Sequence, residues 1–414
     1  MEKKFVKLHC HSTYSMRDGL LKISDIVEKA IKDNEIPCIT DHGSIAGVIE
    51  FIEACDKKEI IGAVGCEFYF NKNIKRLLEL KQLIEEEKDK EKKKNFQIER
   101  DSKKKNNHLV LIAKNTHGFY NIVELNNKAY INGFYNKPII DYDDLFAMQK
   151  DKDGDYGVII TSACFAGAAS RYILNNDMQS ATEWCRMMNA KFGDDFYLEV
   201  QTNGLPEQIT INKGLLEISK KLNIQLCVGI DAHYLESNWL DTHQDLLLLQ
   251  GKNTRADLNK FDYKVTWENR KGEIKTKKIP EGKDFRKGVL VDDIKAGDVF
   301  GKGKNLDKIM KVEKDSRAWA FTSDQLWYKA EKDILNDSTK IHPELKNDIQ
   351  TIIKGNYNIG AKLTKIEIDK DIKLPRTEHG YETLMAKVKA GLKIKIQDEE
   401  VKKEEVQKYI DSIK

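Results

Sequence analysis

The segment FVKLHCHSTYSMRDG (residues 5–19) passes from an apolar run with strand character directly into two histidines, His9 and His11, and reaches Asp18 seven residues later. Residues i and i+2 of a β-strand point to the same face of a sheet, so the two imidazoles are expected to lie side by side. This is the arrangement of a pair of metal ligands. A single such pair is also compatible with histidines on a half-exposed strand, so the interpretation depends on whether the pattern recurs.

Similar apolar runs recur through the first 234 residues, with helical patterns between them. The expected strands are FVKLHCH (5–11), IPCITDHG (36–43), IIGAVGCEFYF (60–70), HLVLIAKN (108–115), YGVIITSAC (156–164), FYLEV (196–200) and QLCVGIDAHY (225–234). Alternating strands and helices are typical of βα units around a parallel sheet. Seven strands suit a closed barrel or an open doubly wound sheet, and the pattern alone does not choose between them.

The composition narrows the class of protein. The 414 residues are 40% hydrophobic, which is enough for a buried core, and the net charge of +3 gives no overall case for nucleic-acid binding. No run of about 18 apolar residues and no signal-peptide pattern is present, which favours a cytoplasmic protein without a membrane segment. Seven cysteines without paired spacing fit a reducing compartment.

Changes in composition suggest three parts. Residues 1–253 hold the seven expected strands and a charge-dense insertion, 71–107, whose first half is expected to be a surface helix and whose Lys-rich end a mobile loop. Residues 254–319 are predicted to form a small β-rich insertion. Residues 320–414 are predicted to be helical and to end in a charged amphipathic tail.

Side chains able to bind a metal stand at the ends of nearly all of the expected strands. They are Asp41, His42, Glu67, His108, Cys164, Asp231 and His233, in addition to His9 and His11, and FYLEV is the exception. In a βα architecture the carboxyl ends of parallel strands meet at one edge, so residues far apart in sequence are expected to converge there.

The chemistry of this set points to transition metals. Imidazole, carboxylate and thiolate together suit zinc, manganese or iron better than calcium, which prefers oxygen ligands. Nine candidate ligands are too many for one ion. Two or three divalent ions are therefore expected, with Glu67 able to bridge a pair. Open positions would hold water as metal-bound hydroxide, which predicts hydrolysis of a phosphate ester. No separate general acid or base is assigned from the sequence.

Seven motifs together resemble a known family. In order, FVKLHCHSTYSMRDG, ITDHG, GCEFYF, HLVLIAKN, TSACFAG, FYLEVQTNGLPEQ and GIDAHYL resemble the PHP (polymerase and histidinol phosphatase) domain at the N-terminus of bacterial-type DNA polymerase III alpha subunits. The likeness covers about residues 1–253 and resumes at FTSDQLWYKAEKDI (321–334). It implies a distorted (β/α)7 barrel of PHP type, with a small β insertion and a C-terminal helical extension.

The resemblance also implies a ligand set. The family's metal positions carry over to His9, His11, Asp18, His42, Glu67, His108, Cys164, Asp231 and His233. By analogy one ion would take His9, His11, Glu67 and Asp231, a second Glu67, His108 and Cys164, and a third Asp18, His42 and His233. The remaining histidines, including His243, fall outside the motifs and are expected to be ordinary packing or surface residues.

Three functions follow from the resemblance. The first is a metal-dependent 3′–5′ exonuclease of proofreading type that acts on DNA 3′ ends beside a polymerase. The second is a non-catalytic, metal-stabilised scaffold that supports a separate polymerase portion or other replication proteins. The third is a small-molecule phosphatase of histidinol-phosphatase type. Neither the Gly-rich nucleotide-binding segment nor the catalytic aspartates of the polymerase family occur in the sequence, so polymerisation is not expected from this chain alone.

The Lys-rich end of the charged insertion supplies the candidate DNA contacts. They are Lys92, Lys93, Lys94, Lys103, Lys104 and Lys105. Lysine clusters neutralise phosphates, although the interspersed acidic residues favour a solvated loop instead.

Overall fold

The computed structural model of the chain describes residues 4–16, 18–269, 271, 274–286, 289–302, 305–316, 318, 320–369 and 379–397. The chain divides into two compact units, Met1–Ile366 and Glu367–Lys414. The expected helical segment 320–414 is therefore divided between the two units. No helix in these ranges is long and apolar enough to cross a membrane.

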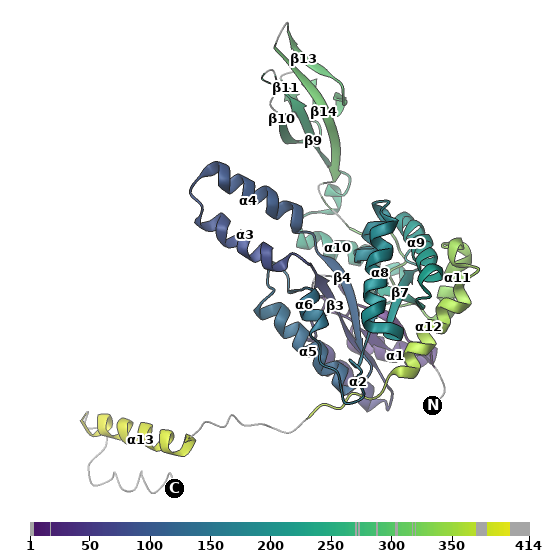
Figure 1. Ribbon diagram of the computed structural model, residues 1–414, viewed down its shortest axis with the longest axis vertical. Helices are drawn as coiled ribbons and strands as arrows, with labels where there is room; N and C mark the ends of the chain where they lie inside the picture. Colours follow the sequence, from purple (N-terminus) through teal and green to yellow (C-terminus); the bar gives the residue numbers. More distant parts are fainter. Residues whose placement is uncertain are drawn as a thin grey trace. The chain divides into compact units, whose positions relative to one another are not determined.

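A central sheet of eight strands forms the core of the first unit, with helices around it (Figure 1). The strands are β1 (Leu8–Cys10), β2 (Cys38–Ile39), β3 (Ala63–Phe70), β4 (Asn107–Ala113), β5 (Ile139–Ile140), β6 (Val158–Thr161), β7 (Phe196–Gln201) and β8 (Leu226–Ala232). The order is β1-β8-β7-β6-β4-β3-β2, with the short β5 paired to β3. All seven expected strands are present, and β5 is an addition.

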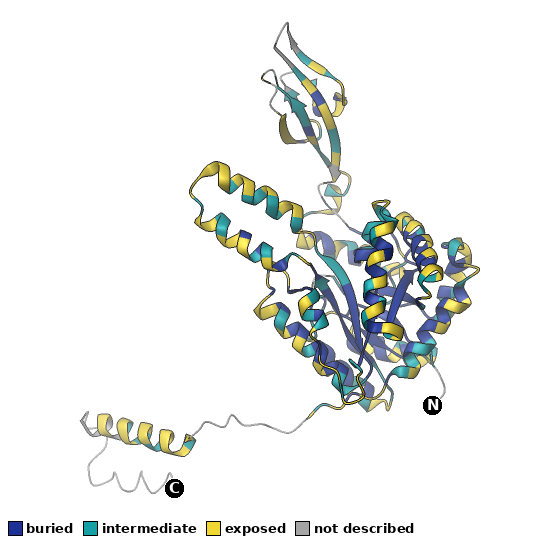
Figure 2. Cartoon of the chain, in the orientation of Figure 1, coloured by how far each residue is buried: buried dark blue, intermediate teal, exposed yellow. Residues whose placement is uncertain are grey.

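Backbone hydrogen bonds between the two ends of this order close the sheet. The Lys7 N–H donates to the Ile36 carbonyl over 3.0 Å, and the Thr40 N–H donates to the Cys10 carbonyl over 2.8 Å. These bonds join the segments that contain β1 and β2, so the sheet is a distorted barrel and not an open doubly wound sheet. The strand residues are almost all buried, as Figure 2 shows.

Strand β4 runs against both of its neighbours, β3 and β6, whereas the other pairs in the barrel are parallel. The expectation of a parallel sheet is therefore wrong at this strand. The cause is the insertion that precedes β4: a pair of helices returns the chain to the edge at which β3 ended. Two helices joined in this way give an antiparallel return, whereas a parallel return needs a crossover to the opposite edge.

Helices surround the sheet, and most of them bury one face. Those of the first unit are α1 (Ile23–Asp33), α2 (Val48–Lys57), α3 (Ile74–Glu86), α4 (Lys90–Lys103), α5 (Thr116–Ile131), α6 (Tyr142–Phe146), α7 (Ala168–Leu174), α8 (Met178–Phe192), α9 (Pro206–Leu222), α10 (Leu240–Gln250), α11 (Glu331–Lys340) and α12 (Ile349–Lys362). In α1 the buried residues Ile23, Ile26, Val27 and Ala30 follow the helical period, and Asn34 ends the helix in the left-handed conformation.

The charged insertion forms the hairpin of α3 and α4. Asp89 caps α4 by accepting hydrogen bonds from the Glu91 and Lys92 N–H groups, and the Arg76 guanidinium binds both oxygens of Glu99 across the hairpin. The expectation of a mobile loop at the Lys-rich end is therefore wrong, because the cap and this bidentate pair stabilise a helix there. Helix α4 has no buried residue (Figure 2).

Residues 254–319 contain β9 (Phe261–Glu268), β10 (Ile274–Pro280), β11 (Asp284–Arg286), β12 (Val289–Leu290), β13 (Val299–Lys302) and β14 (Asn305–Ser316). Four of these form an antiparallel sheet in the order β10-β9-β14-β13. Its core consists of Val265, Ile279, Val291, Ile294 and Ile309. This β module therefore has a hydrophobic core of its own.

The chain on the two sides of the β module pairs directly. The His233 N–H donates to the Leu326 carbonyl over 2.8 Å, and the Tyr328 N–H donates to the Tyr234 carbonyl over 2.9 Å. The segment after the module thus pairs in parallel with the chain at the end of β8. In the second unit, α13 (Gly380–Gln397) is the one helix among the described residues.

Helix α12 is fastened to the barrel by a buried side chain, Asn356. Its amide donates to the carbonyls of Val6 and Val228 over 2.9 and 2.8 Å, and its oxygen accepts from the Val228 N–H over 2.9 Å. The adjacent Gly355 is required by a close approach, because an added Cβ would lie 1.8 Å from the Leu226 carbonyl oxygen.

Replacing Asn356 with alanine is expected to lower the free energy of unfolding by about 3 kcal/mol, because three buried backbone groups would lose their partner. Urea denaturation followed by circular dichroism measures this. Asn358→Ala is the control, since that half-buried amide has a single bond to Gln225. Equal losses in the two variants would contradict the role of Asn356.

Candidate metal centre

An irregularity in the pairing of β1 with β8 places the first two histidines. Leu8 pairs with Gly229 and Cys10 with Ala232, so β8 has one extra residue over this stretch. His9 and Asp231 both adopt positive φ angles, 65° and 47°. Such strained backbone is typical of functional sites. The Nε2 atoms of His9 and His11 lie 3.5 and 3.3 Å from the Asp231 Oδ1 atom, so both imidazoles face the same carboxylate.

Glu67, on β3, lies at the centre of the cluster and is fully buried. Its carboxylate is surrounded by four imidazoles and a thiol: the distances are 3.2 Å to His9 Nε2, 3.4 Å to His11 Nε2, 2.5 Å to His42 Nδ1, 2.7 Å to His108 Nδ1 and 3.4 Å to Cys164 Sγ. One carboxylate therefore contacts residues from four other segments of the chain.

The reversed direction of β4 explains how His108 reaches this edge. His108 is near the amino end of β4, whereas the other ligand candidates lie in the later part of their strands, as His9, Glu67 and Asp231 do, or in the segments that follow. Because β4 is antiparallel to β3, its amino end lies at the edge where β3 ends. Cys164 reaches the same place from the segment after β6, with its Sγ atom 3.6 Å from His108 Nδ1.

Asp18 organises the outer part of the cluster. Its Oδ2 atom lies 2.9 Å from His42 Nε2 and 3.3 Å from His233 Nε2. The rings of His11 and His42 stack, with centroids 4.1 Å apart. The structure thus brings together all nine side chains of the predicted ligand set.

Residues behind the cluster fix the orientation of the imidazoles. The Nδ1 atom of His9 lies 2.6 Å from a buried Glu199 carboxylate oxygen, and that of His233 lies 2.8 Å from the Asp231 carbonyl oxygen. With Nδ1 as the donor in both bonds, each Nε2 lone pair faces the cluster. Ser15 contacts His11 Nδ1 over 3.1 Å and donates to Asp41, which is buried.

Sequence reasoning missed two buried residues of the site. Glu199 on β7 is the acidic residue inside the apolar run FYLEV, and this contrast was the available signal. His243 on α10 was expected to be ordinary, yet it is fully buried, its Nε2 lies 3.6 Å from Asp18 Oδ1, and neither ring nitrogen has a hydrogen-bond partner. Leu247, one turn later on the same face, is also buried, whereas Leu249 is 72% exposed.

The electrostatics of the site depend on burial and on mutual contacts. Burial alone would raise the pKa of Asp18, Glu67 and Asp231, but the neighbouring imidazoles hold the pKa of each carboxyl well below its usual value. Burial lowers the pKa of His11 to about 3, whereas carboxylates overcome burial at His42 and raise its pKa to about 10. Burial raises the pKa of the Cys164 thiol.

Several observations show that these residues fit divalent metal ions. His9 Nε2, His11 Nε2, His42 Nδ1 and Glu67 Oε2 are buried without a hydrogen-bond partner. Such atoms are costly unless something binds them. Four triads have ligand atoms within 4.8 Å of one another: His11, His42 and His233; His9, Cys164 and Asp231; His9, His11 and Glu67; and His42, Glu67 and His108. Nitrogen, oxygen and sulfur donors together suit a transition metal.

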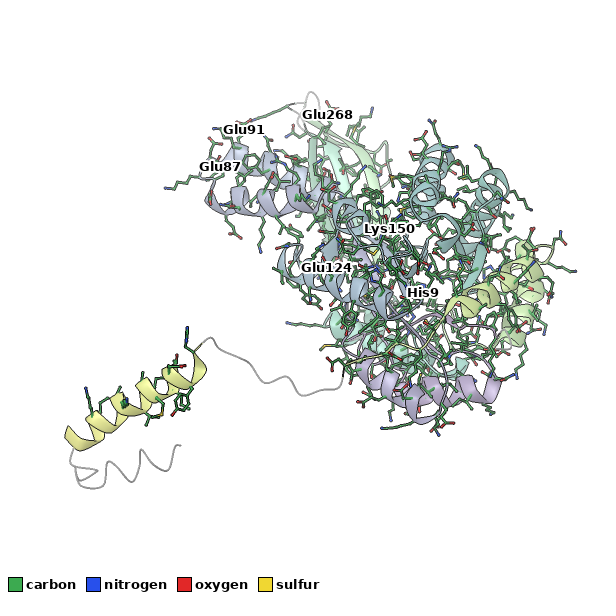
Figure 3. The ribbon with its side chains drawn as sticks, turned by 60° about the horizontal axis from the view of Figure 1, so that its bottom comes forward. His9, Glu87, Glu91, Glu124, Lys150 and Glu268 are labelled. Atoms are coloured by element: carbon green, nitrogen blue, oxygen red, sulfur yellow. The ribbon has the colours of Figure 1, made fainter. Side chains whose placement is uncertain are left out.

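A cavity of about 400 Å³ opens onto the cluster. Asp18, His42, His108, Cys164, Asp231 and His233 line it, together with Tyr14, Tyr69, Tyr130, Lys137, Phe165 and Phe321. Candidate metal ligands and aromatic side chains therefore line the same cavity. Figure 3 shows His9 inside the barrel, away from Glu87 and Glu91 at the far end of the α3–α4 hairpin.

The structure does not bring the six candidate DNA-binding lysines to this cavity. Lys92 to Lys94 are near the start of α4 and Lys103 to Lys105 at its end, about 16 Å apart at 1.5 Å per residue. None of the six lines the cavity. Lys104 instead pairs with Asp101 over 3.1 Å. The six lysines therefore do not form one patch beside the centre.

A family model described as the PHP domain matches this chain over residues 7–203. Residues 7–203 form a PHP domain. The PHP region is shared with proteins named DNA polymerase III subunit alpha: that of Aquifex aeolicus is 36% identical over 65% of this chain and 22% of its own length, and that of Borreliella burgdorferi is 36% identical over 62% of this chain and 20% of its own. The chain thus spans about a fifth of the length of these curated relatives.

A solved structure from Bifidobacterium adolescentis, described as a metal-dependent phosphoesterase, aligns with 55% of this chain and 87% of its own. The identity is 14% and the TM-score 0.29, values too low to infer a shared fold or function.

Replacing Glu67 with glutamine is expected to remove most of the bound metal, because the central carboxylate would lose its charge while its volume is kept. Elemental analysis of the purified protein after dialysis against manganese measures the metal content. The exposed Glu53→Gln on α2 is the control for charge loss elsewhere. Equal metal content in wild type and Glu67→Gln would contradict a central role for this carboxylate.

Proposed function

We propose that the chain is a divalent-metal phosphoesterase that hydrolyses phosphodiester bonds of DNA as a 3′–5′ exonuclease. The observation that carries the proposal is the buried Glu67 carboxylate, which is surrounded by four imidazoles and a thiol. The inward nitrogens of His9, His11 and His42 are buried without a hydrogen-bond partner. The DNA context is supported by the relatives named DNA polymerase III subunit alpha. In that context the partners would be DNA 3′ ends and the rest of a polymerase or other replication proteins, in the cytoplasm.

The proposed ligands are the nine residues of the cluster. His9, His11, Glu67 and Asp231 would hold one ion, Glu67, His108 and Cys164 a second, and Asp18, His42 and His233 a third. This partition agrees with contacts such as His42 to Asp18 at 2.9 Å and Cys164 to His108 at 3.6 Å. Zinc, manganese and iron match the donor set.

When bound, such ions would lower the pKa of a coordinated water toward neutrality and polarise the phosphate ester. The chain's own residues prepare for this. Glu199 holds His9 in one orientation, and Ser15 with Asp41 holds His11. Phe321 lies against His233 and His243, with ring centroids 5.7 and 5.9 Å away, and reduces water access from that side. No separate general acid or base is assigned.

Release of label from a 3′-labelled single-stranded DNA oligomer, in the presence of manganese, tests the proposal. We expect release by the wild type and a loss of at least a hundredfold in Asp231→Asn, which removes a charge that faces His9 and His11. Asp241→Asn is the matched control, because that carboxylate is 74% exposed on the surface. No release by the wild type, or turnover of a small phosphomonoester without action on DNA, would refute the exonuclease.

A metal-stabilised scaffold is the second candidate, because Glu67 ties together residues from β1, β3 and β4 and from the segments after β2 and β6. If ions occupy the cluster, chelation should lower the melting temperature by several degrees, since the folded state alone holds the ligands together. Calorimetry with and without EDTA measures the shift, and added manganese should reverse it. Such a shift in a protein without nuclease activity would favour the scaffold, whereas no shift would contradict metal binding.

A further inference from the structure

Two exposed aromatic side chains stand beside the cavity. Tyr130, near the carboxyl end of α5, and Phe134, in the loop that follows, are each 49% exposed. Their rings are stacked, with centroids 6.1 Å apart and planes at 29°. We call this pair the aromatic ledge. Adjacent exposed aromatic rings form a contiguous apolar patch, and such patches beside a cavity mark ligand-binding surfaces.

The ledge is continuous with the candidate centre. Tyr130 lines the same cavity as Asp18, His42 and His108. Lys137 also lines it and is the one lysine or arginine among the described lining residues. Its ammonium group donates to the Tyr69 hydroxyl over 3.0 Å. A path from the ledge to the cluster therefore passes aromatic faces and one cation.

The loop that holds the ledge is fixed by its own backbone. The Gly133 N–H donates to the Lys128 carbonyl, and the Ile139 N–H donates back to the Gly133 carbonyl over 3.1 Å. Gly133 is required here, because an added Cβ would lie 1.9 Å from the Ile139 carbonyl oxygen. The ledge is thus held in place before any ligand arrives, which lowers the entropy cost of binding.

We propose that the aromatic ledge binds the single-stranded 3′ end of DNA, with bases stacked on Tyr130 and Phe134 and a backbone phosphate at Lys137. This proposal rests on the phosphodiesterase function proposed above. Aromatic platforms combined with cations are the general means of binding single strands, because every base has a stacking face. A cavity of about 400 Å³ has the size of a small-ligand pocket, which suits one unpaired terminal nucleotide and not a base-paired end.

Fluorescence anisotropy with a single-stranded oligomer tests the ledge. The oligomer carries a 5′ dye and 3′-terminal phosphorothioate linkages, so that it stays intact with manganese present. We expect the Kd to rise about tenfold in Tyr130→Ala and about tenfold in Phe134→Ala, because each variant removes the ring on which one base stacks. Tyr130→Phe should keep wild-type affinity. Tyr120→Ala is the matched control, since Tyr120 is 51% exposed on the same helix and does not line the cavity.

Three outcomes would overturn the proposal. The first is equal Kd values for Tyr130→Ala and Tyr120→Ala. The second is a loss of affinity in Tyr130→Ala that is as large for a blunt duplex as for the single strand, and the third is no binding of the oligomer by the wild type. Melting curves of all variants establish that they are folded.

Hydrolysis of bis-p-nitrophenyl phosphate by the wild type reports on the centre separately. Hydrolysis without an effect of Tyr130→Ala on oligomer binding would leave the chemistry standing and remove the ledge. Binding that depends on Tyr130 without hydrolysis would support the ledge and refute the proposed catalysis.

Discussion

The contact on which the rest of the structure depends is the burial of the Glu67 carboxylate among imidazoles. A buried carboxylate without partners would be protonated or would destabilise the fold. Here four other segments of the chain supply its neighbours, and the imidazoles among them hold the pKa of Glu67 well below its usual value. The bulge between β1 and β8, the positive φ angles of His9 and Asp231, and the amino end of the reversed β4 all lie at this edge of the barrel.

The sequence predicted the strands and the cluster well because both rest on short-range patterns. An apolar run of five or six residues is a strand signal, and a polar residue at its end is conspicuous. The nine candidate ligands could be found in this way or through the family resemblance, and the structure brings them together. His9 and His11 face the same carboxylate, that of Asp231, as the expectation of side-by-side imidazoles requires. The strand is not regular there, however, because of the bulge and the positive φ angle of His9.

What the sequence did not predict depends on contacts between distant residues. The direction of β4 goes with the α3–α4 hairpin that precedes it, in which Asp89 caps α4 and Arg76 pairs with Glu99. Glu199 and His243 are separated from the ligands by many residues, so their roles are visible only once the barrel is formed. The Lys-rich segment looked like a loop because charge density alone does not distinguish a solvated helix from a solvated coil.

The pairing on the two sides of the β module has a consequence for how this protein can vary. The backbone hydrogen bond from His233 to Leu326 spans 2.8 Å, although Tyr234 and Leu326 are 92 positions apart in sequence. The chain therefore leaves the barrel and returns to it at nearly the same point. The β module at residues 254–319 can therefore be exchanged for another folded segment whose ends lie close together, as long as α10 with His243 and the segment with Phe321 are kept. The position of the module thus tolerates insertion or loss of a folded segment while His233 keeps its backbone hydrogen bond to Leu326.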